Sequence, residues 1–475
     1  MQLKIRALEV AQAKRMKQDD ELQQYLHIEH TESVRVDAED EADQNEDIPK
    51  IPSSSTKRKG KKRLSIEEKL KGLPVIQETV RIPREVEESP EQWEEIGEVI
   101  TEEVLVIPTK LGRHQIRSKK YRNKQDRTVA PIMAKAPIRF SSSYVSSSLA
   151  IYIVLGKYLD HSTLYRLEKK FERMGLEMTR QSQSDAVERM SEWLRPLYEL
   201  MDKRAKASGY LQIDETFIKY INGNKPGGGQ GYFWAIHAPG QSIVLKWINN
   251  RRHENVETLV EGFEGILQSD GYAAYGNYVE VHPEITLTAC WAHTFRKFRD
   301  AIEHEPEHAK GMMKLISKLY KLEEKWDRSD VSPSKRKLLR KAESIPITKQ
   351  IKAKLDAYAV DMTIPKNDFR IALNYIVNQW PALLECLNHG HVRLDTNLLE
   401  SKFRPTKIGA KNWMFIGHPD AGQKSAIIYS MLQTCTIHKI NPYDYLTDVL
   451  AKLIPHDDRP PEALLENLLP QNWRK

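Results

Sequence analysis

Three acidic residues, far apart in the 475-residue sequence, occupy settings in which a carboxylate can bind a metal ion. Asp214 lies in the middle of the stretch from Tyr210 to Tyr220, whose apolar, β-branched and aromatic residues predict a strand. A carboxylate inside a core strand costs roughly several kcal/mol unless something pairs with it, and a bound cation is a common partner. Asp270 ends a later predicted strand at an Asp-Gly turn, and Glu400 lies on a predicted helix.

The chemistry open to three such carboxylates is metal-assisted attack on a phosphodiester. If two strands and a helix converge at one edge of a mixed sheet, the side chains can hold two Mg²⁺ ions about 3.5–4 Å apart, and Mn²⁺ can take their place. One ion activates the attacking water or 3′-hydroxyl, and the other stabilises the leaving 3′-oxygen. Mg²⁺ prefers oxygen ligands, which suits a site made of carboxylates. We therefore expect Asp214, Asp270 and Glu400 to form a catalytic magnesium site.

Each of these residues also has a simpler interpretation. Asp270-Gly271 is a common turn dipeptide, and Glu400 is spaced to form an exposed pair with Arg404, which would be worth little. Asp214 is harder to dismiss, because aspartate is depleted in strands. The neighbouring Glu215 points to the opposite face of the strand, so we do not expect it to share the ion.

Cys290 and His293 have the spacing of a pair of zinc ligands, but no second pair follows them. A zinc site there would lack partners. We expect Cys290 to pack in a strand and His293 to contact phosphate near the catalytic edge.

The elements that must position the carboxylates alternate between strands and helices. Three predicted strands with short turns, residues 210–220, 232–237 and 242–248, form an antiparallel meander. A helix over 254–267, strands over 267–272 and 285–291 and a helix from 292 follow. The predicted fold is therefore mixed α/β.

Other helices are placed by apolar spacing and by proline. We expect three helices between 144 and 206, the third capped by Ser184 or Asp185. Pro333 and Pro346 interrupt a Lys- and Glu-rich helical stretch, and Pro405 ends the helix that carries Glu400. The tail from Pro455 is rich in proline and winds over the surface.

These patterns predict six units. They are an N-terminal helix with a disordered acidic and basic linker (1–73), a small β-rich unit (74–140), a helical region (141–206), the catalytic core (207–299 and 373–438), a helical insertion (300–372), and a C-terminal helix with its tail (439–475). The helices of 141–206 bind DNA or serve only packing, and we leave both open for their polar faces.

Composition describes an ordinary soluble globular protein with a mild basic bias. Hydrophobic residues make up 40% and charged residues 29%, and the net charge of +7 admits a nucleic-acid partner without proving one. Three cysteines make no disulfide framework, which favours a reducing compartment. The N-terminus lacks the apolar run of a signal peptide, and no apolar run is long enough to span a bilayer. We expect a cytoplasmic protein, associated with the nucleoid when it binds DNA.

Two basic segments are candidates for contact with phosphate. Residues 57–63 form a run that is more often a solvated tail than a specific site. Residues 110–127 interleave arginine and lysine with His114 and Tyr121. A DNA-facing surface and a charged loop are about equally good interpretations of that second segment.

Several short motifs, taken in order, resemble those of a known family. They are Asp214-Glu-Thr216, Ser269-Asp-Gly-Tyr-Ala-Ala-Tyr275, Cys290-Trp-Ala-His293 with Arg296-Lys-Phe298, Asn397-Leu-Leu-Glu400 with Arg404-Pro405, and Lys411-Asn-Trp-Met-Phe-Ile-Gly417. In this order they closely resemble the bacterial insertion-sequence transposases of the "sixty-six" family, over about residues 75–475. Each motif is weak alone, and the set is specific.

The resemblance implies a ribonuclease-H-like DDE core with a helical insertion before the glutamate. It implies Asp214, Asp270 and Glu400 as the catalytic triad, Mg²⁺ as the cofactor, and the inverted-repeat DNA ends of the element as substrate for strand cleavage and strand transfer. It also implies a homodimer on paired ends and small accessory proteins encoded by the element. The predicted DNA contacts are Arg113, Arg117, Lys119, Lys120, His293, Arg296, Arg404, Lys407, Lys411 and Trp413.

One departure from the family concerns zinc. Family members commonly carry a cysteine-rich zinc module ahead of the helices, but this chain has no cysteine before Cys290. We therefore expect no zinc, with the β-rich unit persisting as its metal-free counterpart. Two other functions remain open at this point: a ribonuclease-H-like nuclease that cuts without joining, and a DNA-binding protein with an inactive core.

Overall fold

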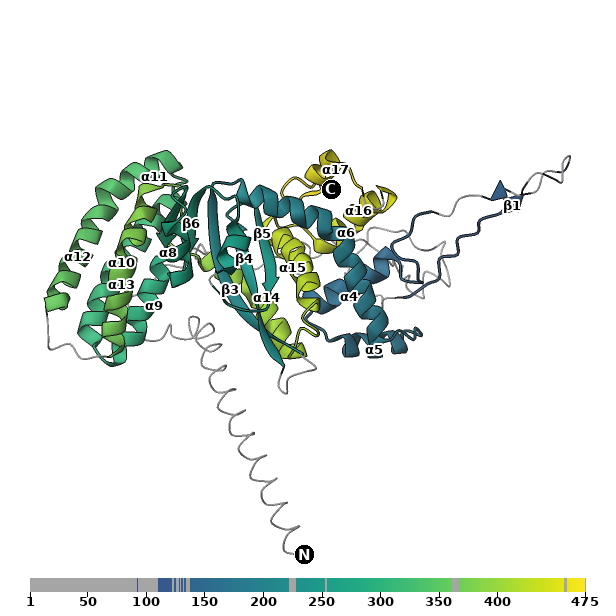
Figure 1. Ribbon diagram of the computed structural model, residues 1–475, viewed down its shortest axis with the longest axis horizontal. Coiled ribbons are helices and arrows are strands. Elements are labelled where there is room, and N and C mark those ends of the chain that lie inside the picture. Colours follow the sequence, from purple (N-terminus) through teal and green to yellow (C-terminus); the bar gives the residue numbers. More distant parts are fainter. Residues whose placement is uncertain are drawn as a thin grey trace, which may run out of the picture.

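The computed structural model describes residues 92, 110–121, 124, 128, 130, 132–133, 137–221, 228–252, 254–360, 367–456 and 459–474. A mixed sheet occupies the centre of the molecule, and helices flank it on two sides (Figure 1). The predicted mixed α/β class is therefore confirmed.

The central sheet has five strands in the order β5-β4-β3-β6-β7. They are β3 (Tyr210–Tyr220), β4 (Gly229–Ala238), β5 (Ser242–Ile248), β6 (Gly265–Ser269) and β7 (Ile285–Ala289). β3, β4 and β5 form the predicted antiparallel meander, whereas β6 and β7 run parallel to β3. The alternation along β3 sends Leu211 and Ile213 into the core and leaves the flanking positions for polar side chains.

One group of helices packs around the meander side of the sheet. It comprises α4 (Ser147–Tyr158), α5 (Leu164–Arg173), α6 (Arg180–Lys206), α14 (Asn397–Trp413), α15 (Ala421–Ile437), α16 (Pro442–Leu453) and, beyond the short helix η6 (Ile454–His456), α17 (Glu462–Leu468). α15 lies against β5 and α6, and α14 lies against β3. One continuous apolar core joins these helices to the sheet.

A second group of helices forms a separate bundle beside β6 and β7 (Figure 1). It contains α9 (Trp291–Asp300), η3 (Ala301–Glu303), α10 (Pro306–Arg328), α11 (Pro333–Leu339), a π-helical turn η4 (Arg340–Ser344), α12 (Ile345–Val360), α13 (Asp368–Glu385) and η5 (Cys386–Asn388). These helices share their own apolar core. Two short helices, α7 (Asn255–Val260) and α8 (Ala273–Glu280), connect the strands.

Three helix boundaries differ from those predicted. The helix expected over 254–267 ends at Val260, because Gly262 and Gly265 adopt φ of +72° and +130° and break it, and Gly265 already opens β6. The strand expected to reach residue 291 ends at Ala289, and Trp291 begins α9. The third N-terminal helix begins at Arg180, where the Thr179 hydroxyl accepts the Ser182 N–H at 3.2 Å.

Prolines also behave differently from the prediction. Pro405 lies inside α14 and does not end it. A proline inside a helix costs about 3 kcal/mol, and burial of Leu399, Phe403 and Thr406 on the inner face offsets that cost. Pro333 begins α11 as expected, but Pro346 does not interrupt the helix, because it follows a π-turn in which Ile345 N–H bonds Arg340 O.

The N-terminal part of the chain lies mostly outside the described residues, whereas the C-terminal tail is described almost to its end. Residues 1–73 lie outside the described residues, as does most of the 74–140 unit, whose described part includes a two-stranded ladder of β1 (Lys120–Tyr121) and β2 (Ile132–Met133). The C-terminal tail does not simply wind over the surface, since Leu468, Leu469 and Trp473 are buried in the main core.

A buried arginine ties the helical bundle to the segment that leads to Glu400. Arg340, at the π-turn, is wholly buried and donates to both carboxylate oxygens of Glu323, at 2.7 and 2.8 Å. It also donates to three backbone carbonyls after α13, those of Cys386, His389 and Val392, at 2.9, 2.6 and 2.9 Å. One side chain therefore holds the end of the bundle together.

We predict that Arg340→Met lowers the free energy of unfolding by about 3 kcal/mol, because it leaves Glu323 buried without its main partner. The value falls at the low end of the usual range because Arg336 still bonds Glu323 at 3.0 Å. Urea unfolding measures the change, and Lys341→Met, an exposed neighbour, is the matched control. Equal stability of the two variants would contradict the assigned role of Arg340.

Candidate active site

The strand register places the two aspartates side by side. β3 and β6 are parallel neighbours in which Tyr210 lies opposite Ile266 and Gln212 opposite Gln268. Extended by two residues beyond its last pair, this register sets Asp214 of β3 across from Asp270, which directly follows β6. The sheet thus brings together two carboxylates that are 56 residues apart in sequence, the same offset as the register.

Asp270 lies in a tight turn directly after β6. Its Oδ1 accepts the Tyr272 N–H at 3.0 Å, and Gly271 adopts φ +90°. Helix α13 covers the turn, with the Tyr375 hydroxyl donating to Asp270 O and Gln379 Nε2 donating to Gly271 O at 3.4 Å. The turn interpretation of Asp-Gly is therefore correct, and it is compatible with a site role because the carboxylate keeps one oxygen outside the turn bond.

Glu400 reaches the same region from α14, one turn after the helix begins. Arg296 of α9 forms a bidentate ion pair with it, Nη1 to Oε2 at 3.0 Å and Nη2 to Oε1 at 2.6 Å. Burial raises the pKa of Glu400, but Arg296 and His293 outweigh it, so the pKa of Glu400 is lowered. The expected helical pair of Glu400 with Arg404 is replaced by this contact with α9.

Asp214 has the most strained electrostatic setting of the three. Burial raises its pKa well above the usual range, and the charges of Asp270, Glu400 and Glu215 raise it further. Its Oδ1 accepts one hydrogen bond, from the Glu215 N–H at 2.8 Å. Asp270 and Glu400 are therefore near enough to Asp214 for their charges to act on its carboxylate. A divalent cation bound by oxygen atoms fits this donor set.

Glu215, next to Asp214 on β3, is held by other residues. Arg251 Nε donates to its Oε1 at 2.5 Å, and the Tyr275 hydroxyl donates to its Oε2 at 3.0 Å. Its pKa is raised by burial, which Arg251 opposes. Both oxygens of Glu215 are thus engaged by side chains of other elements, as both oxygens of Glu400 are by Arg296.

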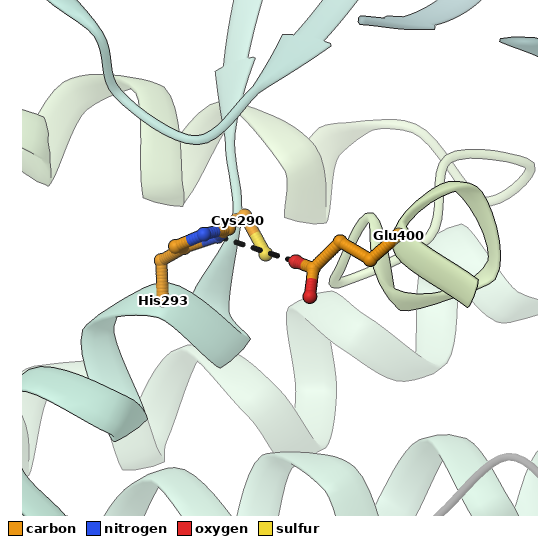
Figure 2. Close-up of side chains that lie close together, drawn as sticks. All are labelled: Cys290, His293 and Glu400. Atoms are coloured by element: carbon orange, nitrogen blue, oxygen red, sulfur yellow. Dashed lines mark ion pairs between the residues drawn. The ribbon is translucent and has the colours of Figure 1, made fainter. Parts of the chain in front are cut away.

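A second group of possible ligands surrounds Glu400. Figure 2 shows Cys290, His293 and Glu400 pointing toward one another, with ligand atoms within 4.8 Å. His293 Nδ1 lies 3.7 Å from Glu400 Oε1. The predicted position of Cys290 in a strand is wrong by one residue, because Cys290 follows β7 and caps α9, although it is buried as expected.

An arginine side chain and a backbone N–H already engage this group. Arg296 Nη2 lies 3.0 Å from His293 Nε2 while it bonds Glu400, so a guanidinium already supplies the local positive charge. Burial raises the pKa of the Cys290 thiol to about 12. The Thr396 N–H also donates to Cys290 Sγ at 3.4 Å.

The predicted DNA contacts fall into three places. His293 and Arg296 lie at the carboxylates, where both face Glu400. On α14, Arg404 and Lys411 are exposed, whereas Lys407 donates to Phe217 O at 3.1 Å and Trp413 packs under Lys157. The four residues of the N-terminal segment, Arg113, Arg117, Lys119 and Lys120, are exposed and lie before or in β1, away from the helical body (Figure 1).

Several residues of the site were missed by the sequence analysis. Arg251 and Tyr375 contact the site from other elements, and nothing local marks them. Tyr275, which donates to Glu215, ends the motif that begins at Ser269, but no role was assigned to it. Gln212 and Gln268 did carry a signal: each is a polar residue in an apolar strand, two positions before an aspartate. Both amides are wholly buried.

The remaining expectations concern cysteine and membranes. Cys290, Cys386 and Cys435, all the cysteines of the chain, are buried and free, as the absence of a disulfide framework predicted. Within the described ranges, every helix is either too short or too polar to cross a bilayer.

The sheet order and the helices on both sides of it define a mixed α/β protein. Comparison with known proteins then identifies the family. The chain belongs to the IS66 transposase family, since the model "Transposase IS66 family" matches residues 142–424 and "IS66 C-terminal element" matches residues 430–471. This family membership supports a transposase role.

Similar proteins come from Sinorhizobium fredii (strain NBRC 101917 / NGR234). "Uncharacterized protein y4jD" is 25% identical over 395 residues, covering 80% of this chain and 76% of that protein. "Uncharacterized protein y4qI" is 27% identical over 397 residues, covering 80% and 72%. Their names state no activity.

Proposed function

We propose that this protein is a DNA transposase that binds the terminal inverted repeats of an insertion sequence and catalyses Mg²⁺-dependent strand cleavage and strand transfer. The observation that carries the proposal is the pairing of β3 with β6, which supports a shared site for Asp214 and Asp270, together with the raised pKa of Asp214, caused by burial and by the charges of Asp270 and Glu400. Such an arrangement is costly in a metal-free fold and becomes favourable when a divalent cation binds.

The fold supports a ribonuclease-H-like DDE core. An antiparallel meander joined to two parallel strands presents Asp214 and Asp270 at one end of the sheet. The mainly helical segment between β7 and α14 lies before the glutamate, where the resemblance places an insertion. The unit boundaries, with the core at 207–299 and 373–438 and the insertion at 300–372, belong to this proposal.

In this mechanism the three carboxylates are the metal ligands. Two bound Mg²⁺ ions would activate the attacking water or 3′-hydroxyl and stabilise the leaving 3′-oxygen, and Mn²⁺ would serve in their place. The chain's own contribution is to orient the carboxylates: β3 and β6 fix the two aspartates, and α14 fixes Glu400. Arg296 holds Glu400 ionised, which a metal ligand requires.

In this proposal, exposed basic residues in two parts of the chain bind DNA: one set on α14 and one set in the N-terminal segment. Arg404 and Lys411 on α14 extend the positive surface outward from Glu400, and the N-terminal segment with Arg113, Arg117 and Lys120 offers a second contact. Assembly as a homodimer on paired ends, cooperation with accessory proteins and a cytoplasmic, nucleoid-associated location are further parts of the proposal.

The test is cleavage and joining of a labelled element end by the full-length protein with Mg²⁺. The proposed activity yields a nicked or cut end and then a joined product, and both disappear with EDTA. Cutting without joining would favour a nuclease. Binding with no cutting in Mg²⁺ or Mn²⁺ would instead indicate an inactive core.

We predict that Arg117→Ala with Lys120→Ala weakens binding to the element end and flattens its salt dependence. Loss of two phosphate contacts reduces the slope of log K against log salt by about 2. Fluorescence anisotropy over a salt series measures it. Lys325→Ala with Arg328→Ala, equally exposed on α10, is the matched control. A slope equal to that of the control would make the N-terminal segment a bystander.

A further inference from the structure

Two buried glutamines lie beneath the aspartates. Gln212 and Gln268 are opposite each other on β3 and β6, and Gln212 Nε2 donates to Gln268 Oε1 at 2.8 Å. The Tyr210 hydroxyl donates to the same Oε1 at 2.7 Å, and His237 Nδ1 lies 2.9 Å from Gln212 Oε1. Burial lowers the pKa of His237 to about 3, so the ring is neutral and can donate that bond from Nδ1.

Both amides also bind the chain segment that precedes α14. Gln212 Nε2 donates to Asp395 O at 2.9 Å, and Gln268 Nε2 donates to Arg393 O at 2.8 Å. The Arg393 N–H returns a bond to the Tyr210 hydroxyl at 3.2 Å. The two strands that carry the aspartates therefore grip the backbone of residues 393–395 through these side chains.

That segment leads directly into the helix of Glu400. The Asp395 carboxylate accepts the Asn397 N–H at 3.2 Å at the start of α14, and Glu400 N–H bonds Thr396 O at 3.0 Å. Glu400 therefore lies within two helical turns of the gripped backbone. A shift of residues 393–395 along the sheet would move Glu400 relative to both aspartates.

The position of this segment in the two apolar cores makes the grip necessary. Val392 and Leu394 pack in the core of the helical bundle, whereas Leu399 and Phe403 of α14 pack in the core of the sheet. The chain crosses from one core to the other between residues 394 and 399. Apolar packing is not directional, so it does not fix the register at this crossing, whereas hydrogen bonds to backbone carbonyls do.

Glutamines that only satisfied each other would be a structural detail of the sheet. Here each amide donates an N–H to a backbone carbonyl more than 100 residues away, in the segment that precedes the helix of Glu400. Buried amides of this kind are costly unless every group is paired. Their placement two residues before each aspartate connects them to the site rather than to the sheet alone.

We propose that Gln212 and Gln268 are positioning residues, which set Glu400 against Asp214 and Asp270 by holding the backbone of residues 393–395. This inference rests on the proposed function, because it assigns the three carboxylates to one metal site. It adds two residues outside the proposed ligand set whose hydrogen bonds determine the position of the Glu400 carboxylate.

The test uses Gln212→Met and Gln268→Met, which keep side-chain length and remove the amide, in the full-length protein. Gln183→Met is the matched control, because Gln183 is equally buried but lies in α6 and bonds Met178 O. Fe²⁺ replaces Mg²⁺, and ascorbate with peroxide then generates radicals that cut the backbone beside the bound ion. Mass spectrometry maps the cuts.

Wild-type protein and the control are expected to be cut near 214, 270 and 400. In both site variants, the cut near 400 falls by at least about tenfold relative to the other two, and the Mg²⁺ concentration for half-maximal cleavage of DNA rises about 10- to 100-fold. Unchanged cuts, or equal loss of all three in a folded variant, would overturn the inference.

A second measurement needs no metal. Hydrogen exchange of peptides spanning 389–400 is expected to be faster in the site variants than in Gln183→Met, while peptides of β4 and β5 exchange as in wild type. Equal exchange over 389–400 would refute the grip. If wild-type protein shows no iron-dependent cuts at all, the proposed metal site fails, and the exchange result still decides whether the glutamines hold the segment.

Discussion

Asp214→Asn is expected to reduce Mg²⁺-dependent cleavage of the element end by about 1000-fold or more while leaving end binding nearly unchanged. The reason is that the amide no longer offers a charged oxygen to the metal site, and a lost metal contact of several kcal/mol corresponds to about three powers of ten in rate. The same result is expected for Asp270→Asn, because Asp270 is the second proposed metal ligand. Single-turnover cleavage and anisotropy separate the two properties.

The same substitution should stabilise the metal-free protein. The pKa of Asp214 is raised in the folded state, so folded protein binds more protons than unfolded protein and stability falls as pH rises between the unfolded and folded pKa values. Above that pH window the ionised Asp214 carboxylate destabilises the folded state. Replacing it with Asn removes this charge and raises the free energy of unfolding by about 1–2 kcal/mol at pH 8.

Thermal unfolding with and without Mg²⁺ checks this prediction. Mg²⁺ should raise the Tm of wild-type protein and raise that of Asp214→Asn much less, because only a competent site binds the ion. Asp356→Asn, exposed on α12, is the matched control and should change neither stability nor activity. Full cleavage activity in Asp214→Asn would remove this residue from the mechanism.

Arg296→Met is expected to lower cleavage at pH 7 by about 10- to 100-fold, the range seen when a partner of a metal ligand is removed. Its guanidinium counteracts burial and holds the pKa of Glu400 below its usual range. Without it, burial dominates, the pKa of Glu400 rises, and the acidic limb of the pH–rate profile moves up by about 1–3 pH units. Activity should therefore recover in part at pH 9.

The pH–rate profile distinguishes this effect from a general loss of folding. A destabilised protein loses activity at every pH, whereas removal of Arg296 moves one limb. The pH dependence of stability is a second measurement. The pair of Arg296 and Glu400 stabilises wild-type protein at neutral pH, and this contribution is lost as pH falls through the lowered pKa of Glu400. Arg299→Met, three residues along α9 and paired with Asp300, is the control. Superimposable profiles would contradict the role given to Arg296.

The sequence alone predicted those features that depend on local pattern. Alternating apolar residues predicted β3, β4 and β5, and the three sit together as the expected meander. The position of Asp214 inside a strand marked it as unusual because aspartate is depleted there, whereas Asp270 lay in a common turn dipeptide. Helix ends were less well predicted, since glycine conformation and tertiary packing decided them at Gly262 and Pro405.

Only the tertiary structure decided how the acidic residues are partnered. The local spacing paired Glu400 with Arg404, whereas the fold pairs it with Arg296, which is 104 residues away in sequence. The engagement of Glu215 by Arg251 and Tyr275, and the grip of Gln212 and Gln268 on residues 393–395, likewise join separate elements. The physical reason is that residue type and spacing determine which face a side chain occupies, but its partners depend on which elements the two cores bring together.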